Sequence, residues 1–316
     1  MLQYSVRRIG AAIPALLAVV IVAFAILRLI PGDPARFIGG ENMGAEQIAV
    51  LRHTLGLDQP LPTQFWHYID GLAHLDLGRS LTTQLQVSSL IGHAMAYTVV
   101  IALSAVLIGI VIALPLGVLA AFARHRGKEK VDGVIMSIVM VMDNIPGFYL
   151  AILLIMLFTS NLGWLPLSGD VSWSHPGALA QRLVMPIMAL ALGTIGNLTR
   201  VTRASVVETL HRDYIRTARS LGTSERTILF RHALPNAGLP IVTMVGLALG
   251  RLVAGTIIVE AIFSIPGIGT QLIQAITSRD YPVIQGLILI YALIFVLINL
   301  ATDIIYTVVD PRVRLS

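Results

Sequence analysis

Six long apolar stretches constrain the fold of this chain more than any other feature of its sequence. A helix needs about 20 predominantly apolar residues to cross a bilayer. Only 12% of the 316 residues are charged and 56% are hydrophobic, which is too little charge to cover a soluble globule of this size. We therefore predict an all-α polytopic membrane protein with six transmembrane helices, at about residues 9–29, 98–122, 134–158, 184–201, 241–259 and 284–308.

The distribution of basic residues predicts the orientation of these helices, because cytoplasmic loops carry an excess of Lys and Arg. The segment 31–97 holds six acidic residues against three arginines and is expected to face outward. The basic groups fall on the other side, so both termini are expected to be cytoplasmic. These groups are Arg7 and Arg8, the basic residues of 124–130, the cluster 203–231, and Arg312 with Arg314.

This topology divides the chain into three parts. We expect an N-terminal transmembrane helix at 1–30, an extracytoplasmic loop with short helices at 31–97, and a five-helix core at 98–316. The first apolar stretch is longer than the 7–15 residues of a signal sequence and lacks a small-residue cleavage site. It is therefore expected to remain as an anchor.

A basic segment at residues 203–236, the 203–236 loop, separates the fourth apolar stretch from the fifth. We predict two helical pieces that meet at Gly222, because a glycine after Leu221 supplies the left-handed residue that ends a helix. A hydroxyl in Thr223-Ser224-Glu225 is expected to cap the second piece. The first piece is expected to carry one stripe of residues: Val206, Leu210, Tyr214, Thr217 and Leu221.

Four polar residues lie near the middle of the expected spans. Such groups face the bundle interior or a wet pathway, because their exposure to lipid is costly. They could line a transport pathway or join helices, for example through an ion pair between Asp143 and Arg251. Pro146 and Gly147 predict a helix break close by. The four residues are Asp143, Asn144, Arg251 and Asn299.

Several chemistries lack the residues they need. The chain has no cysteine, and neither Lys128 nor Lys130 follows a phosphate-binding G-x-x-x-x-G-K-[ST] motif. H-E-x-x-H and G-x-S-x-G are absent, which disfavours a membrane-embedded hydrolase, and the histidines of segment 31–97 match no metal motif. The net charge of +5 is explained by topology. We expect no catalytic residue, metal site, cofactor or nucleic-acid partner.

Short strings in a fixed order resemble the permeases of peptide-type ABC importers, the group that handles dipeptides, oligopeptides, glutathione and nickel. Gly222 lies thirteen residues ahead of Pro235, a spacing similar to that of the family's EAA loop. Arg216 stands where the family consensus has Glu, and His232 stands where an isoleucine is expected. Neither departure argues against docking, but no contact of the consensus glutamate carries over to this chain. The other strings are Pro31-Gly32-Asp33-Pro34-Ala35, residues 55–61, Asp76-Leu77-Gly78-Arg79-Ser80, residues 213–219, Pro266-Gly267-Ile268-Gly269, Arg279-Asp280-Tyr281-Pro282 and residues 310–314.

The resemblance implies a type I importer permease fold in a bacterial inner membrane. It implies a second similar permease, two ATPase subunits that bind ATP and Mg²⁺, and an extracytoplasmic substrate-binding protein as partners. It also implies that the 203–236 loop docks on the ATPases. The coupling residues carried over on this ground are Arg216, Thr217, Ala218, Arg219, Leu221, Gly222, Glu225, Leu234 and Pro235.

Three alternatives remain open at this point. Peptide is the expected cargo, and glutathione or nickel would suit the same architecture. The arginines of the 203–236 loop could instead hold a helix on the lipid surface. An ion-coupled secondary transporter that acts without ATPases is the alternative from another class.

Overall fold

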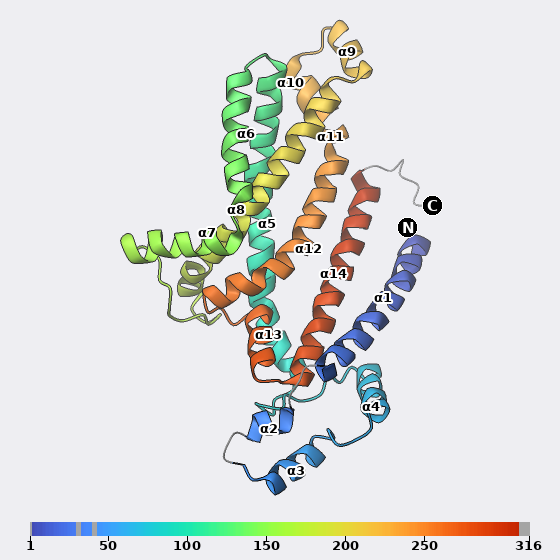
Figure 1. Ribbon diagram of the computed structural model, residues 1–316. Helices are drawn as coiled ribbons and strands as arrows, with labels where there is room; N and C mark the ends of the chain where they lie inside the picture. Colours follow the sequence, from blue (N-terminus) through green and yellow to red (C-terminus); the bar gives the residue numbers. More distant parts are fainter. Residues whose placement is uncertain (1, 30–32, 40–42, 310–316) are drawn as a thin grey trace. The chain divides into compact units, whose positions relative to one another are not determined.

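The computed structural model describes residues 2–29, 33–39 and 43–309. The regular elements in these ranges are helices, apart from one isolated antiparallel bridge between Arg79 and Gln86 (Figure 1). The chain separates into two compact units, Met1–Thr98 with Ile265–Val296 (unit 1) and Val99–Ser264 with Leu297–Ser316 (unit 2). The helices are α1 (Leu2–Leu29), α2 (Pro34–Gly39), α3 (Ala45–Thr54), α4 (Leu61–Ala73), α5 (Val87–His125), α6 (Glu129–Asn144), α7 (Gly147–Leu154), the π-helical η1 (Ile155–Asn161), α8 (Pro176–Leu210), α9 (Asp213–Ser220), α10 (Glu225–Thr227), the π-helical η2 (Ile228–Ala233), α11 (Leu234–Asn236), α12 (Gly238–Ile262), α13 (Ile268–Thr277) and α14 (Tyr281–Val309).

Four helices in the described part of the chain are long and apolar enough to cross a membrane: α5, α8, α12 and α14. The pair α6 and α7 with η1 makes a fifth if the bent pair counts as one span. The described apolar part of α1, Ile13–Ala25, is shorter than a span. The structure thus supports four or five of the six expected spans, and the sixth stays a prediction.

The span expected over 134–158 is broken in the structure, because the chain bends by 95° between Asn144 and Gly147. Pro146 has no backbone N–H to donate to a helix, and its ring pushes the preceding residue out of the helical region. Ile145 accordingly adopts φ −84° and ψ 121°, an extended conformation. The helix break expected at Pro146 and Gly147 is confirmed.

The core of unit 1 lies where the start of α5 meets α13 and the start of α14. Val87, Ile91, Ile268 and Leu287 are all buried there. A Cβ on Gly286 would lie 2.7 Å from the Val87 Cγ1, so only glycine lets α14 approach α5 this closely. Apolar packing between these three helices therefore holds unit 1 together.

A buried carboxylate also joins two distant segments of unit 1. Asp280, only 2% exposed, accepts hydrogen bonds from the Leu81 N–H at 3.0 Å and from the Thr82 hydroxyl at 2.8 Å. The Ser80 hydroxyl donates to the same carboxylate. Hydrogen bonding offsets the cost of burying this charged group. Two strings that carry the family resemblance, residues 76–80 and 279–282, therefore meet in space.

Helix α8 is central to unit 2, where it packs against α6, α7 and α12 (Figure 1). Glycines allow two of the close approaches in this unit. A Cβ on Gly117 of α5 would lie 2.8 Å from the Thr199 carbonyl oxygen of α8, and a Cβ on Gly196 of α8 would lie 2.8 Å from the Asp143 Cβ of α6. Small residues at such contacts are the usual means of close helix packing in membrane proteins.

Candidate functional site

The 203–236 loop folds differently from the two helical pieces expected. Helix α8 runs on to Leu210 and then breaks, and a separate α9 begins at Asp213. Arg212 is extended, with φ −71° and ψ 150°, and Asp213 places a carboxylate in the first turn of α9, where the helix dipole favours negative charge. The first predicted piece is thus two helices with a sharp turn between them.

The second half of that prediction is confirmed. Gly222 has φ +80°, the left-handed conformation expected of it. Ser224 is the N-cap of α10, and its Oγ accepts a hydrogen bond from the Thr227 N–H at 3.3 Å. The chain therefore reverses at Gly222 and immediately starts a new helix.

The stripe of residues expected on one helix face does not continue beyond Leu210, because α8 ends there and α9 begins only after the turn at His211 and Arg212. Val206 and Leu210 are buried, but Ile215 is the buried residue of α9. Leu221 is 80% exposed, and Tyr214 is exposed as well. Leu221 beside the turn and Tyr214 on α9 are therefore exposed rather than part of the apolar cluster below.

An apolar cluster fixes the base of the loop. It joins the end of α5 to both limbs of the loop, with all its central members 4% exposed or less. The partly buried Ala218 and Leu234 pack against it. Because one limb of the loop enters this cluster and the other leaves it, α9 is held on unit 2 at both ends. The cluster consists of Ala121, Val206, Leu210, Ile215, Ile228, Leu229, Ala233 and Ala237.

An ion pair closes the turn above this base. The Arg219 Nε donates to the Glu225 Oε1 at 2.6 Å, and Arg219 Nη2 lies 2.9 Å from the His125 Nε2 at the end of α5. The hydrogen bonds from Arg219, opposed by partial burial, hold the pKa of the Glu225 carboxyl below its ordinary value. Glu225 and Arg219 therefore tie the two sides of the Gly222 turn to each other and to α5.

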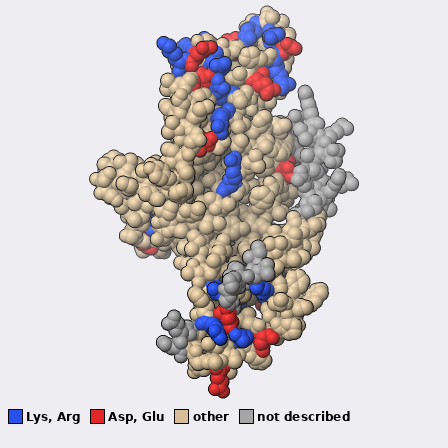
Figure 2. All heavy atoms as spheres, viewed as in Figure 1, with Lys and Arg blue, Asp and Glu red and all other residues tan. Residues whose placement is uncertain are grey.

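The predicted coupling residues separate into an exposed set and a partly buried set. The partly buried ones hold the loop to unit 2, and the exposed ones are free to meet a partner. Ala218, Arg219, Glu225 and Leu234 are partly buried, and Arg216, Thr217, Leu221, Gly222 and Pro235 are exposed. Figure 2 shows Lys and Arg, with Asp and Glu among them, gathered at the end of unit 2 that carries α9 and α10.

The ion pair suggested between Asp143 and Arg251 is not formed. Asp143 instead accepts a hydrogen bond from the Arg200 Nη2 at 2.7 Å and another from the amide of Asn197, both on α8. Arg251 donates to the Met244 sulfur at 3.4 Å on its own helix. Asp143 is thus a helix-pairing residue, but its partner is α8 rather than α12.

A second pair joins the same helices near the loop. Both oxygens of the buried Asp132 of α6 accept hydrogen bonds from the guanidinium of Arg203 on α8, and Arg124 lies 3.6 Å away. The sequence partly indicated these two arginines as partners for carboxylates, because Arg200 and Arg203 lie one helical turn apart at the end of an apolar stretch. Nothing in the sequence indicated which carboxylate each would meet.

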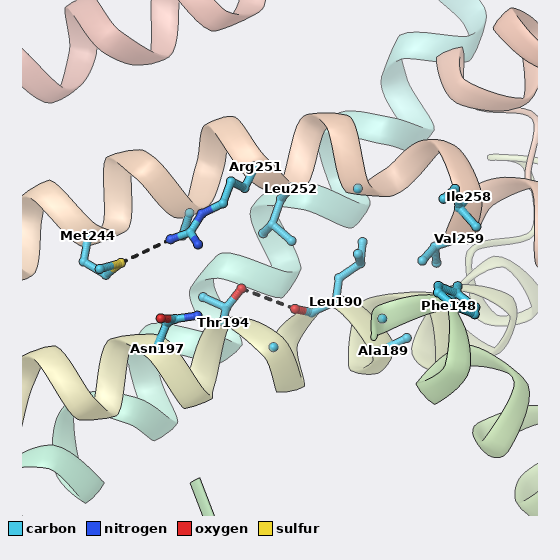
Figure 3. Close-up of a pocket in the computed structure, with 14 residues that line it drawn as sticks. Phe148, Ala189, Leu190, Thr194, Asn197, Met244, Arg251, Leu252, Ile258 and Val259 are labelled. Carbon is cyan, nitrogen blue, oxygen red and sulfur yellow. Dashed lines mark hydrogen bonds between the residues drawn. The ribbon is translucent and has the colours of Figure 1, made fainter. Parts of the chain in front are cut away.

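A cavity of about 290 Å³ opens between α7, α8 and α12 in unit 2. Its wall is mostly apolar, with Phe148, Leu190 and Leu252 among its residues. Figure 3 shows Arg251 and Asn197 on facing helices of this cavity. No Asp or Glu in the described ranges forms an ion pair with Arg251. The cavity thus combines an apolar wall, one cation and one amide, which suits a small ligand that carries a carboxylate.

The remaining predicted polar residues lie elsewhere. Asn144 and Asn299 are exposed and do not line this cavity, and the Asn144 amide donates to the Met140 carbonyl at 2.7 Å. The described ranges contain no group of three His, Cys, Asp or Glu residues that could hold a metal ion. Pro31, Gly32 and the string 310–314 lie outside the described residues.

Comparisons with known proteins agree with this architecture. Residues 113–315 match the family described as binding-protein-dependent transport system inner membrane component, and residues 1–102 match the N-terminal family of the same membrane component. The chain is 38% identical over 314 residues to the glutathione transport system permease protein GsiC of Escherichia coli (strain K12), with 99% of each chain covered. It is equally similar to GsiC of Salmonella typhi, again with 99% of both chains covered.

Solved structures show the same fold at lower sequence similarity. An inward-facing MetNI methionine ABC transporter is 20% identical, with a TM-score of 0.57, over 71% of this chain and 97% of that one. An amino acid ABC transporter with histidines has a TM-score of 0.51 at 20% identity, over 72% of this chain and 95% of that one.

Proposed function

Because this chain belongs to the inner membrane permeases of peptide-type ABC importers, we propose that it forms half of a peptide translocation pathway and receives the motion of two ATPase subunits through the 203–236 loop. The family is one of multi-pass inner membrane subunits without catalytic activity of their own. ATP and Mg²⁺ would bind to the ATPases, and an extracytoplasmic binding protein would deliver the substrate. Family membership does not support the ion-coupled alternative.

The observation that carries this proposal is the way α9 is held. A short helix transmits force only if it cannot swing on its own. Here both limbs of the loop enter one buried cluster, and the pair Arg219 and Glu225 closes the turn. Leu221, 80% exposed beside the Gly222 turn, is accessible to a docked partner. A helix that only rested on lipid would need no such closure.

In the proposed complex, ATP binding would draw the two ATPases together and rock unit 2 of each permease. The pathway would then open alternately to either side of the membrane, as in other rigid-body switches. This proposal includes six spans, an outward-facing segment 31–97, cytoplasmic termini and a second homologous permease.

Peptide is the proposed cargo, and the cavity of Arg251 and Asn197 supports it. A peptide offers a terminal carboxylate to the Arg251 guanidinium. The Asn197 side chain, held by Asp143 and Arg200, adds a polar group to the facing wall. Glutathione, the substrate named for the relatives GsiC, is a peptide with two carboxylates and would suit the same residues. It is the second candidate, and nickel import remains a third within the family.

The coupling proposal is tested by substrate-stimulated ATP hydrolysis in the complex reconstituted with its ATPases and binding protein. Gly222→Asp is the variant of choice, since Asp tolerates a left-handed conformation and no atom lies within 4 Å of a Cβ built at Gly222. The loop should therefore fold, but the added side chain should obstruct docking. We expect stimulated hydrolysis and uptake to fall at least about tenfold, the effect of losing about 1.4 kcal/mol of coupling.

Gly127→Asp is the matched control. Gly127 has φ +68° and equally open surroundings, but it lies between α5 and α6, outside the 203–236 loop. Normal activity of Gly222→Asp, or an equal loss in both variants, would refute coupling through this loop. Assembly of each complex is checked by gel filtration, so that a failure to fold is not taken for a failure to couple.

A further inference from the structure

A second hollow in unit 2 lies on the outside of the helices, between the last turns of α5 and η2. Its volume is about 580 Å³, and its wall is almost entirely apolar. Pro115, Leu119 and Phe122 form the α5 side, and Phe230 belongs to the η2 side. The twelve residues of α5 from Leu114 to His125 make this groove about 18 Å long.

Two arginines stand at one end of the groove. Arg126 ends the α5 side, and Arg226 belongs to the other side. The Arg126 guanidinium lies over the Phe122 ring, with Cζ 4.3 Å from the ring centroid, so it is held against the apolar wall. The groove is therefore apolar along its length and carries two positive charges at one end.

Neither of these two arginines forms an ion pair with an Asp or Glu in the described part of the chain. Glu225 precedes Arg226 in the sequence, and the hydrogen bond from Arg219, helped by the charge of Arg126, lowers the pKa of its carboxyl. That carboxylate is already hydrogen-bonded by Arg219 at 2.6 Å and 3.3 Å. An anionic ligand at the end of the groove would meet two unpaired guanidinium groups.

The apolar wall is open as well. Leu119 is 52% exposed and Phe230 is 55% exposed. Leu119 belongs to α5, the most apolar of the candidate spans, so its surroundings in the membrane include acyl chains. Long apolar grooves that end in basic residues at a membrane surface suit molecules with a hydrocarbon tail and an anionic head.

We propose that this groove binds an anionic phospholipid, with an acyl chain along Pro115, Leu119 and Phe230 and the phosphate between Arg126 and Arg226. The acyl chain would cover an apolar surface whose exposure to water is unfavourable. Its headgroup would satisfy both arginines, which a zwitterionic headgroup would do less well.

The lipid would also contact η2, one limb of the 203–236 loop. Binding would hold this limb against α5 and so favour the loop conformation described here. This consequence rests on the proposed function, whereas the binding site itself does not.

Native mass spectrometry of the 316-residue chain tests the site directly. The chain is purified in detergent with defined mixtures of phosphatidylglycerol and phosphatidylcholine, and the retained lipids are counted. We expect one phosphatidylglycerol to be retained in preference to phosphatidylcholine. The double variant Arg126→Gln with Arg226→Gln should weaken this retention about tenfold or more.

The matched control is Lys128→Gln with Arg231→Gln, which removes the same charge from two exposed residues outside the groove. Leu119→Trp, which fills the groove without changing charge, should also displace the lipid. Equal retention of both lipids by the wild type would overturn the proposal. So would an equal loss in the groove and control variants, because that would indicate a general surface charge effect.

A final comparison separates this proposal from the coupling proposal. ATP hydrolysis by the reconstituted complex is measured in nanodiscs with and without phosphatidylglycerol. Activation by phosphatidylglycerol that disappears in the double variant supports the lipid site. If the double variant retains lipid normally but no longer assembles with the ATPases, the groove is a protein interface and the lipid site is wrong.

Discussion

Arg219 and Glu225 face each other across the Gly222 turn, with the Arg219 Nε 2.6 Å from the Glu225 Oε1. The two residues belong to different helices, α9 and α10, and six positions separate them in the sequence. The guanidinium also reaches the His125 ring at the end of α5. One partly exposed ion pair thus joins the two sides of the turn to which the ATPases are proposed to bind.

Removing this pair should uncouple transport far more than it destabilises the chain. A partly exposed ion pair contributes about 1 kcal/mol or less to folding, so Glu225→Gln should change the unfolding temperature little. Substrate-stimulated hydrolysis should nevertheless fall several-fold, because α9 could then swing on its own. Glu208→Gln, which breaks the exposed pair with Arg212 at 2.9 Å, is the control. Equal losses in both variants would contradict a special role for the turn.

The same pair predicts a pH dependence of stability. The pKa of Glu225 lies below its ordinary value of 4.5, chiefly because Arg219 hydrogen-bonds the ionised form. Its contribution is therefore complete above pH 4.5 and is lost as the pH falls through the lowered pKa of the folded state. The difference in unfolding temperature between wild type and Glu225→Gln should be constant from about pH 7 to 5 and should vanish at more acidic pH. A difference that instead grows on acidification would show that the sign is wrong.

Local chemistry explains which parts of the 203–236 loop could be predicted. Within this loop, the turn at Gly222 and the cap at Ser224 each depend on one residue and its immediate neighbours, as does the break at Pro146 between α6 and α7. The turn at His211 and Arg212 contains neither Gly nor Pro, so no local rule indicated it. The helix that follows this turn buries Ile215 in the cluster that includes Ala121 of α5, a tertiary contact that the local sequence does not show.

The partner of Asp143 could not be predicted for a different reason. Arg200 lies at the end of one apolar stretch, and Arg251 lies in the middle of another. Either guanidinium could pair with a carboxylate inside the membrane. The choice depends on which face of α8 and of α12 turns toward α6. Helical periodicity fixes the faces of one helix but not the rotation of three helices about one another.

Close packing between α5 and α8 supplies a test of the fold of unit 2. A Cβ on Gly117 would lie 2.6 Å from the Thr202 Cβ and 2.8 Å from the Thr199 carbonyl oxygen. Gly117→Ala should therefore destabilise the chain by about 1–3 kcal/mol through overpacking. Gly133→Ala in α6, where no atom lies within 4 Å of the added Cβ, should be neutral or stabilise by up to about 1 kcal/mol. Thermal unfolding in detergent measures both, and a tolerated Gly117→Ala would show that the two helices are further apart.

Variants of Asp143, Arg200 and Arg251 distinguish a role in joining helices from a role in the transport pathway. Asp143→Asn should destabilise the purified chain by about 1–3 kcal/mol, because it leaves the Arg200 guanidinium without its carboxylate. The double variant with Arg200→Gln should recover part of that loss, since the two residues interact directly. Arg251→Gln should change stability by less than about 0.5 kcal/mol, as it breaks no ion pair, yet it should raise the substrate concentration needed for half-maximal uptake. A large loss of stability in Arg251→Gln with unchanged uptake would place Arg251 in the framework of unit 2 rather than in the pathway.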